Sequence, residues 1–263
     1  MYKCYRLENS EELKDLVSSY EECGKQIMEG KKANIRKDLD EYLRKDGFID
    51  FTNMQEDWFP AISADVFISH SHKDISLINA LVGWLTIEFK VDVFVDSYIW
   101  GYCNDLLKEI DEEYCRHSNG VSYDYDKRNI STTHVHMMLS NSLNKMIDKT
   151  ECVLFVETDN SLSVKNNIET GTTSAWIYSE LITTSLISRR IPKRLNNKNV
   201  EIREKYSGIF HNEINSLYRV DLSHLIKLDI SDLKEISQKE LKGEKPYLDE
   251  LYKTVNAERV LNG

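Results

Sequence analysis

The stretch that most constrains the fold of this chain covers residues 64–74, Ala-Asp-Val-Phe-Ile-Ser-His-Ser-His-Lys-Asp. It contains a short apolar run of β-forming residues, 66–68, which is typical of a strand buried on both faces. A polar turn follows, and apolar residues then recur at helical spacing from Ile75 to Leu85. Strand, turn and helix together predict the first half of a βαβ unit.

The turn at the end of this strand is a candidate binding site. In open α/β sheets, ligands bind beyond the carboxyl ends of the strands, where such turns lie. Topology alone therefore selects five polar residues as site candidates: Ser69, His70, Ser71, His72 and Asp74. The competing interpretation is an ordinary solvated turn between a strand and a helix.

Further apolar runs, at residues 91–95 and 152–156, alternate with helical patterns, and a shorter run lies at 225–228. This alternation predicts a parallel sheet with helices on both faces. Right-handed crossovers limit such a sheet to flavodoxin-like or Rossmann-like arrangements. We therefore expect an α/β, flavodoxin-like fold of about five parallel strands, with a helical N-terminal extension and C-terminal additions.

The expected domain boundaries follow from the same patterns. Residues 1–62 show two helical periods and no buried strand pattern, which predicts a helical extension that packs on the main domain without joining its sheet. Residues 63–230 form the predicted α/β domain, and the polar stretch 116–133 reads as an inserted loop. Residues 231–263 are predicted to be a C-terminal helical segment, with Pro246 at the first turn of its last helix.

Composition narrows the class of protein. The formal net charge of −10 argues against non-specific binding to nucleic acids or anionic membranes. No apolar run approaches the roughly 18 residues of a membrane span, and the N-terminus lacks the apolar core of a signal peptide. The five cysteines include no CxxC pair and read as free thiols, so we expect a cytoplasmic protein.

Several common site signatures are missing. No GxGxxG follows a predicted strand, and no GxxxxGK[ST] occurs, which argues against a dinucleotide-fingerprint dehydrogenase and a P-loop NTPase. No GxSxG elbow is present. His134 and His136 would diverge by about 200° on a helix, and no third ligand is in register, so no metal site is expected.

A second candidate site lies on the helix predicted to begin near Ser174. Trp176 and Glu180 are four residues apart and share one face of this helix. Glu180 has aromatic and apolar neighbours and follows a long polar loop, which favours a functional role. For a single glutamate on a helix, a solvated structural role is the more common alternative.

Taken in order, these motifs resemble the TIR (Toll/interleukin-1 receptor) domain. They are the strand and turn at 66–74, the strand at 91–95 that leads to Asp96, the strand at 152–156, and Ser-x-Trp-x-x-x-Glu-Leu at 174–181. The resemblance covers about residues 63–190 and implies a five-stranded, flavodoxin-like parallel sheet. The insertion and the two terminal additions depart from a minimal TIR domain and resemble bacterial stand-alone TIR proteins of anti-phage defence, including the Thoeris type.

The resemblance also implies an activity. In enzymatic members the glutamate of this helix is the catalytic residue of an NAD⁺ nucleosidase, which points to Glu180. The turn after the first strand, here Ser69, His70 and Ser71, would border the nicotinamide ribose, and the loop from Asp96 to Gly101 would gate the pocket or contact a neighbouring subunit. Trp100 and Trp176 would stack on a ring of the substrate, with core packing as the alternative. NAD⁺ is then the substrate, and no cofactor is expected.

Cleavage of the nicotinamide–ribose bond of NAD⁺ can be catalysed with a single carboxylate. Nicotinamide in NAD⁺ is already cationic, so its departure needs no general acid. A glutamate that accepts hydrogen bonds from the ribose hydroxyls can hold the sugar and stabilise the oxocarbenium-like centre. Attack by water gives ADP-ribose, and attack by the adenine or the second ribose of the substrate, if held nearby, gives a cyclic ADP-ribose. Such a product would act as a nucleotide signal that a downstream effector senses.

The alternative is a TIR domain that self-associates and catalyses nothing. Glu180 favours the enzyme, because an adaptor has no need of a carboxylate at that place. Self-association is expected in either case, since Tyr98, Ile99 and Trp100 would gather on one exposed turn. Release of nicotinamide from NAD⁺ distinguishes the two.

Overall fold

The computed structural model describes residues 1–8, 10–31, 39–45, 47–99, 103–165, 169–195 and 218–257. The chain divides into two compact units. Unit 1 comprises Met1–Gly30, Ser63–Val95 and Ile147–Gly263, and unit 2 comprises Lys31–Ile62 and Asp96–Met146. The main α/β unit is therefore assembled from three separate segments, rather than from the single segment 63–230 that the sequence predicts.

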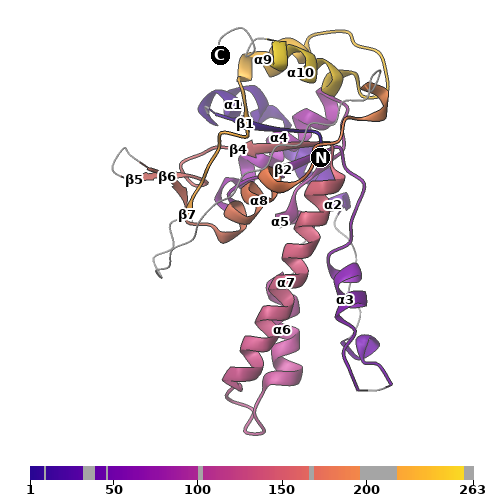
Figure 1. Ribbon diagram of the computed structural model, residues 1–263, viewed down its shortest axis with the longest axis vertical. Helices are drawn as coiled ribbons and strands as arrows, with labels where there is room; N and C mark the ends of the chain where they lie inside the picture. Colours follow the sequence, from indigo (N-terminus) through magenta and orange to yellow (C-terminus); the bar gives the residue numbers. More distant parts are fainter. Residues whose placement is uncertain are drawn as a thin grey trace. The chain divides into compact units, whose positions relative to one another are not determined.

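Unit 1 is built around a parallel sheet of five strands, which helices flank (Figure 1). The strands lie in the order β3-β2-β4-β1-β8, and every neighbouring pair is parallel. They are β1 Lys3–Leu7, β2 Val66–Ser69, β3 Val93–Phe94, β4 Cys152–Val156 and β8 Ile226–Leu228. The predicted α/β, flavodoxin-like class is confirmed.

Strands β2 and β4 explain why the prediction of the fold class succeeded. All four residues of β2 and all five residues of β4 are buried. A strand covered on both faces needs apolar side chains at every position, so it appears in the sequence as a continuous apolar run. The predicted strands at 91–95 and 225–228 are also present, as β3 and β8.

The predicted helical extension at residues 1–62 is wrong at its beginning. Residues Lys3–Leu7 form β1, which pairs with β4 along its whole length and with β8 on its other side. Lys3 and Arg6 interrupt the apolar pattern of this strand, so the sequence did not indicate a buried strand here. The structure accommodates Arg6 through an ion pair with Glu157, at the carboxyl end of the sheet. The side chains of Cys4, Tyr5 and Leu7 are buried and supply its core contacts.

The helices after β1 also belong to unit 1. The helical character expected of residues 1–62 is present in α1 Ser10–Val17 and α2 Glu21–Lys31, which a 3₁₀ turn at Ser18–Tyr20 separates. Helix α4, Ile75–Glu88, crosses this segment at two glycines. A Cβ at Gly24 would lie 1.8 Å from the carbonyl oxygen of Asn79, and one at Gly83 would lie 2.4 Å from that of Tyr20. Only glycine permits so close an approach of the two backbones.

The rest of unit 1 contains a second, smaller sheet and three helices. The three strands are antiparallel in the order β5-β6-β7, at Ser163–Lys165, Glu169–Thr172 and Tyr218–Arg219. The first two occupy part of the long polar segment that precedes α8, Ala175–Leu186. The C-terminal segment forms α9, Ile230–Ser237, and α10, Pro246–Ala257, and α10 begins at the predicted proline.

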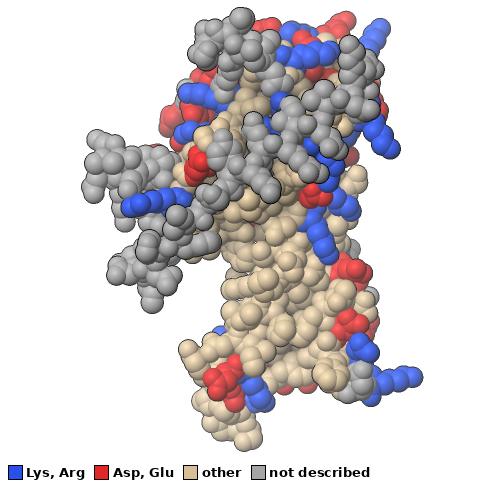
Figure 2. All heavy atoms as spheres, in the orientation of Figure 1, with Lys and Arg blue, Asp and Glu red and all other residues tan. Residues whose placement is uncertain are grey.

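Unit 2 is mostly helical. Its elements are a 3₁₀ turn at Leu39–Tyr42, α3 Phe51–Trp58, α5 Asp96–Ile99, α6 Cys103–Ile110, a π-helical turn at Asp111–Cys115, and α7 Tyr125–Lys149, whose last residues belong to unit 1. Figure 2 shows that the surface over the middle of α7 carries few charged side chains. Asp50 caps the first turn of α3, where its side chain accepts hydrogen bonds from the backbone N–H groups of Thr52 and Asn53.

The predicted inserted loop at 116–133 is shorter than expected. A turn closed by a bridge between Arg116 and Tyr123 ends at Asp124, and α7 begins at Tyr125. The Asp124 carboxylate accepts a hydrogen bond from the backbone N–H of Lys127 at 3.0 Å, which lowers the pKa of this carboxyl group. The first turns of α7 are exposed, so they lack the apolar period that would have revealed a helix.

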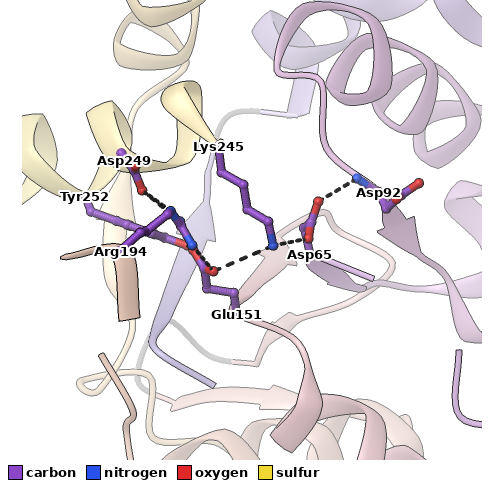
Figure 3. A network of polar contacts seen from close by, with 7 residues as sticks. All are labelled: Asp65, Asp92, Glu151, Arg194, Lys245, Asp249 and Tyr252. Atoms are coloured by element: carbon purple, nitrogen blue, oxygen red, sulfur yellow. Dashed lines mark hydrogen bonds and ion pairs between the residues drawn. The ribbon is translucent and has the colours of Figure 1, made fainter. Parts of the chain in front are cut away.

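The amino ends of the strands are joined by a network of charged side chains (Figure 3). Arg194 contacts both oxygens of Glu151, at 2.7 and 2.5 Å, and Asp249 of α10 at 2.7 Å. Lys245 pairs with Asp65, which also accepts from the backbone N–H of Asp92. Glu151, Asp65 and Asp92 each immediately precede a strand. The network therefore lies at the edge of the sheet opposite the predicted binding edge.

The cysteines and the lengths of the helices bear on two further expectations from the sequence. All five cysteines are free thiols, as predicted. Within the described ranges, no helix combines the length and the apolar character needed to cross a membrane.

Candidate functional site

Strand β2 brings Ser69 to the carboxyl edge of the sheet. Ser69 is the last residue of the strand and stands in register with Phe155 of β4. Its side chain is almost fully buried, with 2% of the residue exposed. A buried hydroxyl needs a hydrogen-bond partner, because an unpaired one opposes folding.

Helix α8 brings Glu180 to the same place. Ser174 caps this helix, as the sequence suggested, and its hydroxyl accepts from the backbone N–H of Ile177 at 3.3 Å. The inward face of α8 contains Glu180 among apolar residues, and its buried members are Ile177, Glu180, Leu181 and Thr184. Glu180 is 4% exposed, so the alternative of a solvated helix carboxylate is wrong.

The two side chains meet directly. The Ser69 hydroxyl donates a hydrogen bond to Oε2 of Glu180 at 2.5 Å, between residues 111 positions apart in the sequence. A hydroxyl that donates to a carboxylate makes a short, charge-assisted bond. The contact fixes one carboxylate oxygen at the carboxyl edge of the sheet. The structure thus brings together two of the residues that the sequence selected independently.

His70 and Ser71, the next two residues of the turn, are buried as well, at 4% and 9% exposure. The His70 ring stacks on that of His72, with centroids 5.7 Å apart and an interplanar angle of 14°. The Ser71 hydroxyl accepts from the backbone N–H of Lys73 and caps the short 3₁₀ turn at His72–Asp74. This turn is therefore packed and capped, unlike the solvated turn of the competing interpretation.

Asp74 has a structural partner in the loop that follows β4. Its two carboxylate oxygens accept from the Thr158 hydroxyl at 2.5 Å and from the side-chain amide of Asn160 at 2.6 Å. These bonds join the turn after β2 to the turn after β4. Asp74 therefore shapes the edge that contains Ser69 and Glu180.

The other predicted site residues lie on α8, on α5 and beyond the described residues. Trp176 is half-buried on α8, one helical turn before Glu180. Asp96 is half-buried at the start of α5 and belongs to unit 2. Trp100 and Gly101 lie outside the described residues, as do the side chains of Tyr98 and Ile99.

One contact near Glu180 was not predicted. Thr184, one turn further along α8, lies with its hydroxyl 2.9 Å from Nε2 of His224, in the turn before β8. Arg189 donates to the His224 backbone carbonyl at 3.0 Å. Burial, together with the nearby Arg189 charge, lowers the pKa of His224 below its usual value of 6.5. The spacing of Glu180 and Thr184 placed both on one helix face, but nothing in the sequence marked His224 as their neighbour.

Among the described residues, no group of three or more His, Cys, Asp or Glu side chains is arranged to hold a metal ion. His134, one of the two histidines considered for such a site, stacks on Phe51 with ring centroids 4.5 Å apart.

Comparisons with protein-family models, with curated proteins and with solved structures found no match to this chain.

Proposed function

We propose that this chain is a TIR-type NAD⁺ nucleosidase that cleaves the nicotinamide–ribose bond. Water then attacks the ribose and gives ADP-ribose, or a nucleophile of the substrate itself attacks and gives a cyclic ADP-ribose isomer. The observation that carries the proposal is the buried hydrogen bond between Ser69 and Glu180 at the carboxyl edge of a parallel sheet. Ligands of open α/β folds bind at this edge. The motif order that resembles TIR domains supports the same assignment, and the defence-signalling role rests on that resemblance alone.

Glu180 would do the chemistry. Loss of neutral nicotinamide from NAD⁺ leaves positive charge on the ribose, and an anion held close to this charge lowers the barrier. A carboxylate among apolar neighbours attracts a positive centre strongly, because little water is present to screen the two charges from each other. The ribose hydroxyls would donate to the same carboxylate and hold the sugar in place.

Ser69 would position this carboxylate. Its hydroxyl holds Oε2 at 2.5 Å, so the carboxylate is oriented before substrate arrives. Preorganised groups need no rearrangement during the reaction, which is why they contribute strongly to catalysis. Because Glu180 is only 4% exposed, a ribose can reach it only when neighbouring groups move. We therefore expect activity to depend on a conformational step, such as assembly or a trigger.

The experiment compares nicotinamide release from NAD⁺ by the wild-type protein and by Glu180→Gln. The glutamine keeps the side-chain volume and an acceptor for Ser69 but removes the negative charge, so the rate should fall about 10²–10³-fold. Glu88→Gln is the matched control, since Glu88 also accepts a hydroxyl hydrogen bond, from Tyr20 at 2.7 Å, on another helix of unit 1. Its activity should equal that of the wild type. Equal rates for Glu180→Gln and wild type, with both folded, would remove Glu180 from the mechanism.

The burial of Glu180 also favours a second candidate, a TIR-like interaction module without catalysis. A carboxylate that is 4% exposed and bonded to a serine can serve to fix α8 on β2. In that case NAD⁺ stays intact, and Glu180→Gln changes only the melting temperature. Measuring both nicotinamide release and the melting temperature of wild type and Glu180→Gln therefore separates the two candidates.

A further inference from the structure

The connections of the main sheet single out one place on its carboxyl edge. Strands β2 and β4 are neighbours, but the chain leaves them in opposite directions, through α4 to β3 at one edge and through α8 to β8 at the other. In open α/β sheets, ligands bind outside the carboxyl ends of two strands whose connections diverge in this way. The Ser69–Glu180 pair stands at the end of β2. The first residue after β4, Glu157, stands at the other half of the same place.

Glu157 lies on the same face of the sheet as Ser69. Ser69 is in register with Phe155 of β4, and Phe155 is in register with Arg6 of β1, so these three side chains share one face. Glu157 follows Phe155 by two residues, its backbone N–H donates to the Leu7 carbonyl at 2.9 Å, and its carboxylate contacts Arg6. Standard strand dimensions place the Cα atoms of Ser69 and Glu157 about 8 Å apart.

Arg6 orients the Glu157 carboxylate and leaves part of it available. The Nε–H of Arg6 donates to Oε2 of Glu157, and Oε1 of Glu8 lies 3.3 Å from the same Nε. Within the described part of the chain, no hydrogen bond to Oε1 of Glu157 is found. The Glu157 side chain is 26% exposed, so a ligand can reach it. The result is an oriented acceptor beside the Ser69–Glu180 pair.

We propose that Glu157 binds the adenosine ribose of the substrate and makes the site selective for NAD⁺ over NADP⁺. The inference rests on the proposed function, in which Glu180 holds the nicotinamide ribose. A dinucleotide contains two riboses, and the two carboxylates supply each of them with an acceptor for its hydroxyl groups. The 2′-hydroxyl of the adenosine ribose donates to Oε1 of Glu157, as an acidic residue does in other dinucleotide sites of α/β sheets.

NADP⁺ differs from NAD⁺ at this hydroxyl group alone. Its 2′-phosphate carries a charge of about −1.5 to −2 near neutral pH, so it repels a carboxylate and has little proton left to donate. A site that is built to accept from a hydroxyl group rejects a ligand without one, because the polar group of the site then stays unpaired. Arg6 offers the phosphate little compensation, since Glu157 and Glu8 already face its guanidinium group.

The test is calorimetric titration of the full chain with ADP-ribose and with ADP-ribose 2′-phosphate. The wild type should bind ADP-ribose about 30-fold more tightly or better. Glu157→Gln removes the charge and one of the two carboxylates that face Arg6, so it should bind the 2′-phosphate ligand about tenfold more tightly than the wild type does. Misfolding does not produce such a gain. Asp148→Asn is the matched control, because Asp148 also pairs with an arginine, Arg190 at 2.9 Å, but precedes the amino end of β4. Its preference should equal that of the wild type.

Equal affinities of the wild type for the two ligands, binding of neither ligand, or an unchanged preference in Glu157→Gln would each overturn the assignment of Glu157. Cleavage assays with NAD⁺ and NADP⁺ keep this result apart from the proposed function. If NAD⁺ stays intact while ADP-ribose is bound with the expected preference, the proposed cleavage fails and the role of Glu157 in binding stands. If NAD⁺ and NADP⁺ are cleaved equally well, the role of Glu157 fails and the cleavage stands.

Discussion

The network of charged side chains in Figure 3 includes Arg194, and its contribution to stability can be measured against that of Arg190, four residues earlier in the sequence. Arg194 is 16% exposed and its partners Glu151 and Asp249 are 13% and 22% exposed. Arg190 is 59% exposed and pairs with Asp148, which is 42% exposed. Both arginines make ion pairs, so they differ mainly in burial and in the number of carboxylates that they contact.

Replacing Arg194 by Met keeps most of the apolar stem and removes the charge. The change leaves Glu151 and Asp249 partly buried, with Lys245 at 3.8 Å as the remaining cation near Glu151. Breaking a fully buried pair costs about 3–5 kcal/mol, and an exposed pair contributes about 0–1 kcal/mol. We expect Arg194→Met to lower the free energy of unfolding by about 2–3 kcal/mol, and Arg190→Met to lower it by about 0.5 kcal/mol or less.

Urea denaturation followed by tryptophan fluorescence measures both values. Adding Glu151→Gln to Arg194→Met should restore about 1 kcal/mol or more of the free energy of unfolding, because it removes one of the two carboxylates that lost their arginine partner. Equal losses for the two arginine variants would refute the argument from burial. Because the network lies at the amino ends of the strands, neither variant should alter the nicotinamide release that we propose for Glu180.

Three further predictions concern stability. Gly83→Ala should destabilise unit 1 by about 2 kcal/mol or more, because its Cβ would lie 2.4 Å from a backbone oxygen, whereas Gly30→Ala, with nothing within 4 Å, should be neutral or slightly stabilising in thermal melts. Asp111→Ala should cost unit 2 about 2–3 kcal/mol, since this buried carboxylate accepts two side-chain hydrogen bonds, while Asp105→Ala at an exposed position should cost less than about 0.5 kcal/mol. Because the pKa of His224 is lowered in the folded state, the unfolded state binds the proton more readily, so stability should fall as pH drops below about 6.5, and His224→Gln should flatten this dependence in melts from pH 5 to 8.

The elements that the sequence predicted well are those whose burial is symmetric. Strands β2 and β4 are covered on both faces, so each appears as an uninterrupted apolar run. β1 occupies the position next to β4 but contains Lys3 and Arg6, and ion pairing of Arg6 lets a central strand contain a charged residue. The beginning of α7 was not predicted, because its first turns are exposed and an exposed helix has no periodic apolar side.

The candidate site could be predicted one residue at a time but not as an arrangement. Ser69 followed from its place after a buried strand, and Glu180 from its place on a helix with apolar neighbours. Their contact spans 111 positions and depends on how α8 crosses the sheet, which no local pattern encodes. His224 escaped notice because a single histidine in a polar turn shows no period or spacing.

Product analysis is the sharpest test of the proposal that this chain converts NAD⁺ by means of Glu180. Purified protein is incubated with NAD⁺ at protein concentrations from about 1 to 300 µM, and the products are separated by chromatography and identified by mass. We expect nicotinamide and either ADP-ribose or a cyclic ADP-ribose in equal amounts, with both products reduced about 10²–10³-fold in Glu180→Gln. Intact NAD⁺ at every protein concentration, or equal product from wild type and Glu180→Gln, would contradict it.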